Sequence, residues 1–571
     1  MDYSYLIEQK MRSSEDLLSE GSSLAKNCRL GSSLFLKQHN ISSEAEFKRI
    51  QAKKGQMMQH AHIGFRNLDK TISAMKEIYE VAITEGFSIS RYGITLDWTM
   101  GYPPDQRNKG QKGTGIVLYE PDDFARISNA TPAATHFGDF MLGLPGSLHN
   151  TKSAIAAGVT SIGNLGQYFT FRLPYWDDDV ATTEATVTAL GLIAAQKEEI
   201  LVHSNLDDGF AGMFRDMSSA LGMVIIEKYI VEDLIGANVS FCFGHHYSEP
   251  LRRAAFHAAL AQVSNSPGTM IFGNTVSYKN VAAANYASLA SYLLTDILSL
   301  GRFHTGHAIN PVPVTENIRI PDVGEIIDAQ RFAARLIEHA PEHGKAIDCS
   351  SIDSIAKLIV EGGQLFAQRA LKGLEELEVN ISDPAALMLA IRRIGARKME
   401  EMFAARDPFV EADWARELDE KATHWIRDKK ENSIRLEDLR IAIATTDVHE
   451  HGAYLVKKVL EGLGAQVINI GISIDAEDLV LKALEHNANV IAVSTYNGVA
   501  LKYARRVLLE LEAKTMSLPL VIGGKLNEID ETSNSGLPRD VSKQLSDLGA
   551  YPCHDLDAML VTLQNLLSEI S

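Results

Sequence analysis

The C-terminal part of the chain alternates short β-branched runs with helical patterns, and this alternation limits the possible folds more than any other feature. Each apolar run is short enough for a buried strand, and each intervening stretch has the length and period of a helix. Strands that alternate with such helices predict a doubly wound parallel sheet, whose ligands bind at the carboxyl ends of the strands. The predicted strands are residues 441–446, 466–470, 490–494 and 518–522, followed by a last helix–strand–helix pattern up to residue 571.

Polar residues and glycines follow three of these predicted strands. The first strand leads into Asp447, and His449 and Gly452 lie in the turn before the next helix. Imidazole is a good ligand for a transition metal, and a carboxylate two residues away can hold its second ring nitrogen. Glycine allows backbone or a flat cofactor to come close. Two other strand ends carry Ser494, Thr495, Gly523 and Gly524, so three strand ends together predict one ligand site.

The pattern Asp447-x-His449-x-x-Gly452, with Ser494-Thr495 and Gly523-Gly524, resembles the cobalamin-binding domain of the cobalamin-dependent mutases and of methionine synthase. The resemblance covers residues 436–571 and implies a flavodoxin-like sheet. It implies that His449 ligates cobalt in place of the cofactor's own dimethylbenzimidazole base, with Asp447 behind it. The displaced nucleotide tail would lie beside Gly452 and the other two strand ends. Tyr496 stands where the family often has leucine, which affects packing around the tail rather than cobalt ligation.

Residues 86–345 show a second alternation of short apolar runs with helical patterns. Eight runs over this length predict a closed (β/α)₈ barrel, whose chemistry lies just after the strands. The runs end in neutral polar residues with few free carboxylates, which suits the orientation of a small polar substrate beneath a cofactor. The predicted strands are 94–98, 138–142, 160–162, 200–204, 223–227, 240–243, 270–272 and 302–304.

This portion also resembles the barrel subunit of glutamate mutase, more distantly than the C-terminal part resembles its family. Ser90-Arg91-Tyr-Gly93-Ile-Thr-Leu96 resembles the strand that carries a carboxylate-binding arginine, and Leu173-Pro174-Tyr175 resembles a loop with a tyrosine in the substrate pocket. His307 falls where the family places charged residues near the adenosyl group. Two positions depart from the family: Leu144 replaces a second arginine, and Asn164 replaces a glutamate that handles the substrate's amino group.

Composition excludes several classes of partner. The formal net charge of −18 argues against nucleic acid, because phosphate neutralisation needs clustered lysine and arginine. The longest apolar runs are too short to span a bilayer, and the N-terminus has no signal-peptide pattern. The four cysteines lie far apart with no metal-ligand spacing, which predicts a reducing, cytoplasmic location.

The flanking segments are expected to be helical. Residues 1–85 predict an N-terminal helical segment in which His60 and His62 lie on a solvated surface, and residues 346–435 predict a helical linker before the cobalamin-binding domain at 436–571. We also expect a homodimer formed through the barrel.

Two reaction classes fit a barrel with a cobalamin domain, and a third interpretation is not catalytic. A mutase would use adenosylcobalamin for a radical 1,2-rearrangement, while the protein binds the substrate and excludes water. A methyltransferase of the methionine synthase type would need a strong methyl-donor site, commonly zinc with thiolates, and the chain has no cysteine pair. A cobalamin carrier or sensor would not require a barrel with a polar mouth.

We therefore expect an adenosylcobalamin-dependent carbon-skeleton mutase of a small carboxylic acid, with His449 as the cobalt ligand. Arg91 would pair with a substrate carboxylate, and Arg172 could supply a second cation. With Asn164 in place of an acid, an acid without an α-amino group, such as 2-methyleneglutarate, is expected to be a better substrate than glutamate. Tyr175 and His307 complete the expected pocket.

Overall fold

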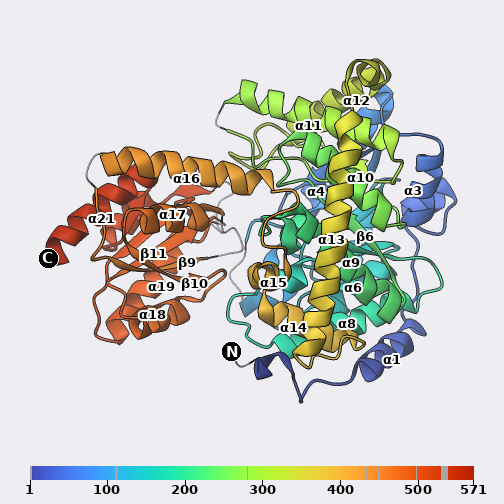
Figure 1. Cartoon of the computed structure of the whole chain (residues 1–571). Helices are drawn as coiled ribbons and strands as arrows, with labels where there is room; N and C mark the ends of the chain where they lie inside the picture. Colours follow the sequence, from blue (N-terminus) through green and yellow to red (C-terminus); the bar gives the residue numbers. More distant parts are fainter. Residues whose placement is uncertain are drawn as a thin grey trace. The chain divides into compact units, whose positions relative to one another are not determined.

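The computed structural model describes residues 3–109, 113–279, 281–431, 434–446, 451–496, 498–528 and 538–570. Contacts along the chain divide it into two compact units (Figure 1). The first unit comprises Met1–Thr170 and Asp178–Trp414, and the second comprises Phe171–Asp177 and Ala415–Ser571. No helix in these described ranges is both long and apolar enough to cross a membrane.

The described residues of the first unit contain eight parallel strands in two ladders. One ladder has the order β3-β2-β1-β8-β7, and the other has the order β4-β5-β6. The ladders meet at one edge, where Phe243 and Ile271 form a parallel bridge and the Phe272 amide donates to the Phe243 carbonyl at 2.7 Å. The strands are β1 (Met58–Ile63), β2 (Ile89–Ile94), β3 (Ala134–Phe137), β4 (Ser161–Gly163), β5 (Leu201–Asn205), β6 (Asn238–Cys242), β7 (Met270–Ile271) and β8 (Ala308–Ile309).

Helices follow most of these strands, as expected for parallel strands joined by crossover connections. Serine side chains cap the first three α-helices, each accepting a backbone N–H of the first turn. The α-helices are α1 (Ser14–Ala25), α2 (Leu34–His39), α3 (Glu44–Lys53), α4 (Leu68–Glu85), α5 (Pro121–Ser128), α6 (Ser147–Ala156), α7 (Gln167–Thr170), α8 (Asp179–Ala194), α9 (Met217–Lys228), α10 (Pro250–Val263), α11 (Ala282–Arg302), α12 (Val323–Ala346), α13 (Ser350–Glu376), α14 (Pro384–Ile394) and α15 (Ala396–Phe403). Short 3₁₀ or π turns are η1 (Ser4–Leu6), η2 (Trp98–Gly101), η3 (Arg107–Lys109), η4 (Asp207–Ala211) and η5 (Tyr229–Ile235).

Several predicted strands of this unit are wrong. Strand β1 lies inside the segment expected to be helical, and its His60 is buried rather than solvated. Residues 223–227 belong to α9, because a helix that is buried on all sides has no polar face to show its period. Residues 302–304 follow the body of α11, and the strand comes later, at β8. The first two predicted strands lie several residues too late, since β2 and β3 end at Ile94 and Phe137.

Helix α13 packs closely against α9 because small residues face each other at the crossing. A Cβ on Gly222 would lie 2.5 Å from the Phe366 ring, and a Cβ on Gly362 would lie 2.5 Å from the Ser218 side chain. The contact therefore depends on glycine at both positions. Residues 350–376, expected to form part of a linker, thus pack into the first unit.

The second unit is a parallel sheet in the order β10-β9-β11-β12-β15, which is the flavodoxin-like order 2-1-3-4-5. The strands and intervening helices predicted for this region are confirmed within two residues. Its elements are α16 (Asp413–Glu431), β9 (Arg440–Thr445), α17 (His451–Gly462), β10 (Gln466–Gly471), α18 (Ala476–Glu485), β11 (Val490–Thr495), α19 (Ala500–Ala513), β12 (Leu520–Gly524), β13 (Asn527–Glu528), β14 (Arg539–Asp540), α20 (Ser542–Asp547), β15 (Tyr551–Cys553) and α21 (Leu556–Ile570).

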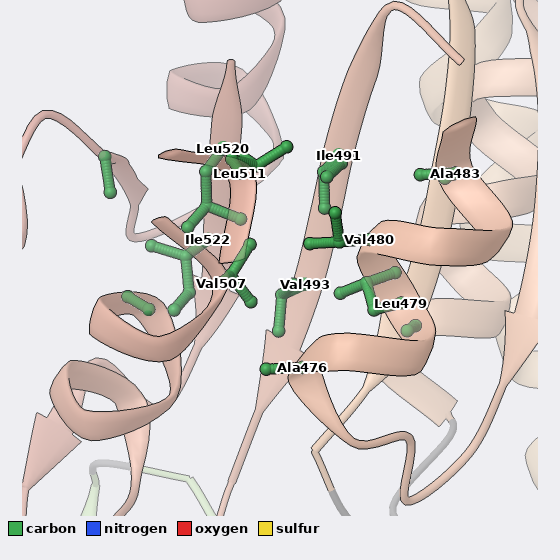
Figure 2. Packing of buried hydrophobic residues seen from close by; sticks show 14 of the residues in the cluster. Ala476, Leu479, Val480, Ala483, Ile491, Val493, Val507, Leu511, Leu520 and Ile522 are labelled. Atoms are coloured by element: carbon green, nitrogen blue, oxygen red, sulfur yellow. The ribbon is translucent and has the colours of Figure 1, made fainter. Parts of the chain in front are cut away.

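Alternate residues of the central strands point to opposite faces of this sheet and build two cores. One core joins Ile491, Val493 and Ile522 to helices α18 and α19, as Figure 2 shows. The other joins Ile441 and Ile443 to α16, α17 and α21. Because both faces are covered, the strands read as continuous apolar runs, and their polar residues are confined to the strand ends.

Candidate functional site

The carboxyl ends of β9, β11 and β12 lie side by side in the second unit. Ser494 pairs with Gly523 and Thr495 with Gly524 in the ladder. The amide of Thr446, just after β9, donates to the Ser494 carbonyl at 3.1 Å. The structure thus brings together the described strand-end residues that the sequence assigned to one ligand site. The predicted cobalt ligand His449, and Asp447, which is expected to hold its other ring nitrogen, lie outside the described residues.

Thr495 and Gly524 fix the turn after β12. Thr495 is buried, and its Oγ1 donates to the Lys525 carbonyl at 2.8 Å while its own carbonyl accepts from the Lys525 amide at 2.7 Å. Gly524 has a φ of +89°, and a Cβ there would lie 2.2 Å from the Thr495 carbonyl oxygen. Glycine at 524 is therefore required by the protein's own backbone.

Gly452 and Gly523 are different, because the described residues do not require glycine at either position. A Cβ on Gly452 would lie 3.4 Å from Ser494 Oγ, and a Cβ on Gly523 would lie 3.4 Å from the Cys553 carbonyl oxygen. Both are ordinary van der Waals distances. Two glycines that have room for a methyl group among the described residues, at strand ends beside Ser494, fit a ligand that approaches the backbone closely.

Arg172 and Tyr175, two predicted pocket residues, lie in the short segment that groups with the second unit. The Tyr175 amide donates to Asp475 Oδ2 at 3.0 Å, and the Tyr175 ring lies 4.2 Å from the Arg506 guanidinium. Burial raises the pKa of Tyr175 to about 12 and that of Asp475 to about 6. Arg172 is exposed. These two residues thus belong to the second unit, whereas Arg91, Asn164 and His307 belong to the first.

Arg91 lies in the interior of the first unit and is only 1% exposed. Its Nε donates to Glu44 Oε1 at 2.8 Å, and its Nη2 donates to the Ser161 hydroxyl on β4 at 3.3 Å. Lys48 also faces Glu44, at 3.6 Å. The predicted carboxylate-binding arginine is thus already paired with a carboxylate of the chain.

Neutral histidines surround this ion pair. His60 Nδ1 lies 3.4 Å from Arg91 Nη1, and the rings of His136 and His203 are 4.4 Å apart. Burial, then the charge of Arg91, lowers the pKa of all three histidines well below its ordinary value. Arg91 and Lys48 are cations, Glu44 is an anion and the three imidazoles are uncharged. This layer of buried residues therefore carries one net positive charge.

Asn164 lies at the carboxyl end of β4 and contacts two carboxyl groups. Its Nδ2 donates to Asp208 Oδ2 at 2.8 Å and lies 3.4 Å from Asp139 Oδ1, while its Oδ1 accepts from the Asn205 amide at 2.9 Å. Asn164 Nδ2 thus brings the Asp139 and Asp208 carboxyl groups close together. Burial raises the pKa of both acids, and the charge of Asp139 raises that of Asp208 further.

A third acid, Asp207, lies beside this pair and is hydrogen-bonded to its own neighbours. Asp207 accepts the amides of His245 at 3.0 Å and His246 at 3.2 Å, and it contacts His246 Nδ1 at 3.3 Å. Burial would raise the pKa of Asp207, but the bond and charge of His246 outweigh it and lower this pKa. Asp207 therefore stays ionised and adds negative charge next to Asp208.

His307 lies at the other end of its strand. It directly precedes β8, whereas Asn164 follows β4, and the strands are parallel. Its Nδ1 contacts the Thr305 hydroxyl at 2.8 Å, and its ring packs on Phe243 at a centroid distance of 5.6 Å. The structure does not bring His307 and Asn164 into one pocket.

A cavity of about 980 Å³ also opens at the amino-terminal side of the strands. Its wall includes the first residues of β1 and β2, Met58 and Ile89, together with Tyr79 and Arg302. Asn164 follows the carboxyl end of β4, so the cavity lies at the opposite ends of the strands from Asn164.

The sequence analysis missed Asp139 and Asp208. Asp139 was placed inside a predicted strand, whereas it follows β3 by two residues. Asp208 follows the end of β5 by three residues, in the π turn η4. The expectation of few free carboxylates at the strand ends is therefore wrong, and the Asp207-Asp208 doublet after an apolar run was the available signal.

Comparison with known protein families matches residues 438–537 to the B12 binding domain. Among solved structures, the chain is similar to the 1.5 Å crystal structure of a novel cobalamin-binding protein from Desulfitobacterium hafniense DCB-2, with 16% sequence identity and a TM-score of 0.18. That match covers 43% of this chain and 82% of the other. The family match lies within the second unit, on the strand ends described above. The second unit therefore contains a cobalamin-binding domain.

Proposed function

We propose that the chain is an adenosylcobalamin-dependent mutase that rearranges a small carboxylic acid. The observation that carries the proposal is a cobalamin-binding domain in one chain with eight parallel strands whose carboxyl ends bear polar groups. Binding and orientation of a small polar substrate is what a strand-end site of this kind supplies, while the cofactor supplies the difficult chemistry.

In this proposal His449 is the lower ligand of cobalt and Asp447 its hydrogen-bond partner. Gly452 and Gly523 make room for the nucleotide tail, and the turn held by Thr495 and Gly524 forms its wall. Ser494, half-buried between the two open glycines, offers the tail a hydroxyl. When bound, adenosylcobalamin supplies hydrogen-atom abstraction through homolysis of its cobalt–carbon bond.

The first unit would bind the substrate inside a closed (β/α)₈ barrel. The bond from Arg91 on β2 to Ser161 on β4 and the bridge between β6 and β7 support closure. The net positive layer around Arg91, Lys48 and Glu44 favours a carboxylate held above it. The neutral histidines exclude water from that layer without adding a competing charge.

The test of cobalt ligation is electron paramagnetic resonance of the chain reconstituted with cob(II)alamin. We expect hyperfine coupling from an imidazole nitrogen in the wild type and its loss in His449→Ala. Coupling from dimethylbenzimidazole in both proteins would contradict the assignment of His449.

The test of the reaction class is turnover of small dicarboxylic and amino acids. We expect turnover with adenosylcobalamin and none with methylcobalamin. Turnover with methylcobalamin alone would instead indicate a methyltransferase.

A further inference from the structure

Asn164 holds together two carboxyl groups from different strand ends. Asp139 follows β3 and Asp208 follows β5, and one amide nitrogen of Asn164 reaches both. Two carboxyl groups held this close by one amide nitrogen disfavour double ionisation, so the pair favours retention of a proton. Residues Asp139 and Asp208 are both partly exposed.

The charges around this pair are negative. Asp207 stays ionised beside Asp208 and raises its pKa. The largest effects that lower the pKa of Asp208 are the hydrogen bonds of Asn164 and Asn205, and the largest that lowers the pKa of Asp139 is the hydrogen bond of Asn164. A close pair of acids is costly to ionise fully, and an added cation would offset that cost.

A second observation at the same strand end points to a ligand. Gln167 is 0% exposed, and its Oε1 accepts the amide of Phe140, the residue after Asp139, at 2.8 Å. Its Nε2 has no hydrogen-bond partner in the described residues. A buried amide donor without an acceptor is unfavourable unless something outside the chain supplies one.

We propose that Asp139 and Asp208 together bind a cationic nitrogen on the substrate. This inference rests on the proposed function and names its substrate class, an acid that also carries an amine. The ammonium group arrives with its own positive charge, the retained proton leaves to solvent, and both carboxylates are then ionised around the ammonium. Gln167 Nε2 donates to an oxygen of the same molecule.

The inference revises the preference for acids without an amino group. That preference came from Asn164 standing where the related enzyme has a glutamate. In the structure Asn164 donates to two acids, so its role in the proposal is to position these acids rather than to contact the cation itself.

The experiment is calorimetric titration of the full chain without cobalamin, in two buffers of different ionisation enthalpy. The probes are L-glutamate, L-ornithine and β-alanine, with glutarate as the matched acid without an amine. We expect at least one amine to bind with release of up to one proton per site, and glutarate to bind about tenfold or more weakly without proton release.

Asp139→Asn and Asp208→Asn should each lower amine affinity about ten- to a hundredfold and abolish the proton release, because one charge-assisted contact is lost. Asp105→Asn removes an exposed acid in the same unit and should change neither quantity. Two results with the wild-type chain would overturn the inference: glutarate and the amines bind equally well, or none of the amines releases a proton when it binds. Neither result depends on whether a variant folds.

The outcome is separable from that of the proposed function. If the adenosylcobalamin-loaded chain rearranged an acid that has no amine, the proposed mutase activity would be supported. The proposed role of Asp139 and Asp208 would be contradicted. If the chain bound an amine with release of a proton but only methylated its substrate, the role of the two acids would be supported. The proposed mutase activity would be contradicted.

Discussion

At the scale of single residues, three glycines in the cobalamin-binding domain have different reasons to be glycine. Gly524 is fixed by its positive φ and by the Thr495 carbonyl, whereas Gly452 and Gly523 have room for a methyl group. The family resemblance assigns all three glycines to the cofactor site. The geometry of the described residues shows that Gly524 is required by the backbone, whereas Gly452 and Gly523 are not.

Substitution of these glycines should separate folding from cofactor binding. Gly452→Ala and Gly523→Ala should leave the melting temperature unchanged but weaken cobalamin binding at least tenfold, because the methyl group fills the space for the tail. Gly524→Ala should destabilise the unit by about 1–3 kcal/mol through backbone strain. Thermal melts and cobalamin titration by absorbance check this, and unchanged binding in both open-glycine variants would show that the tail lies elsewhere.

A buried ion pair in the first unit makes a second prediction at this scale. Glu44→Gln leaves the charges of Arg91 and Lys48 without their anion, and a buried charge stripped of its partner costs about 3–5 kcal/mol. Denaturant unfolding should show this loss, and Glu77→Gln, an exposed acid on α4, should show none. If Glu44→Gln left the free energy of unfolding unchanged but altered the affinity for glutarate, the result would indicate that Arg91 belongs to the substrate site.

At the scale of elements, α9 is joined to β5 by an acid that is neutral at physiological pH. Ser204 Oγ on β5 donates to Glu227 Oε1 at 3.0 Å, and Glu227 is 1% exposed. Burial raises the pKa of Glu227 to about 8. The folded state therefore holds this proton more tightly than the unfolded chain, in which glutamate has its ordinary pKa.

The stability of the first unit should consequently fall as pH rises from about 5 to 8. Between the unfolded and folded pKa values the folded state binds the extra proton, so stabilisation present at low pH is lost as pH rises through the folded pKa. Glu227→Gln should flatten this slope in melting temperature against pH, while Asp233→Asn, an exposed acid nearby, should keep it. Because Asp208 in the same unit also has a raised pKa, part of the slope remains in Glu227→Gln. A slope as steep as that of the wild type would contradict the assignment.

The elements also show what can be predicted from sequence and what cannot. In the second unit, strands covered on both faces read as apolar runs, so β9 and β11 were predicted nearly to the residue. In the first unit, β1 carries His60 and His62, whose buried partners come from distant parts of the chain. Likewise the pairing of Asp139 with Asp208 depends on tertiary structure, because 69 residues separate them.

At the scale of the whole molecule, the second unit begins earlier than the domain boundary predicted at residue 436. Helix α16 contributes Ala422 and Trp425 to one core of the sheet, and its Asp419 accepts the Tyr454 hydroxyl at 2.7 Å. The predicted four-part division otherwise stays a prediction.

A fragment of residues 415–571 should therefore fold alone and bind cobalamin, since it contains both cores of the sheet. A fragment of residues 436–571 should have a lower melting temperature, because one core loses its cover. Circular dichroism and absorbance titration of the two fragments check this. Equal stability of the two fragments would show that α16 is not part of the folding unit.

The most direct test of the whole account is product analysis after turnover of the adenosylcobalamin-loaded chain with a panel of small amino and carboxylic acids. The account predicts an isomer of unchanged mass, in which nuclear magnetic resonance shows a group and a hydrogen exchanged between neighbouring carbons. A product heavier by one methyl group, formed only with methylcobalamin, would contradict it.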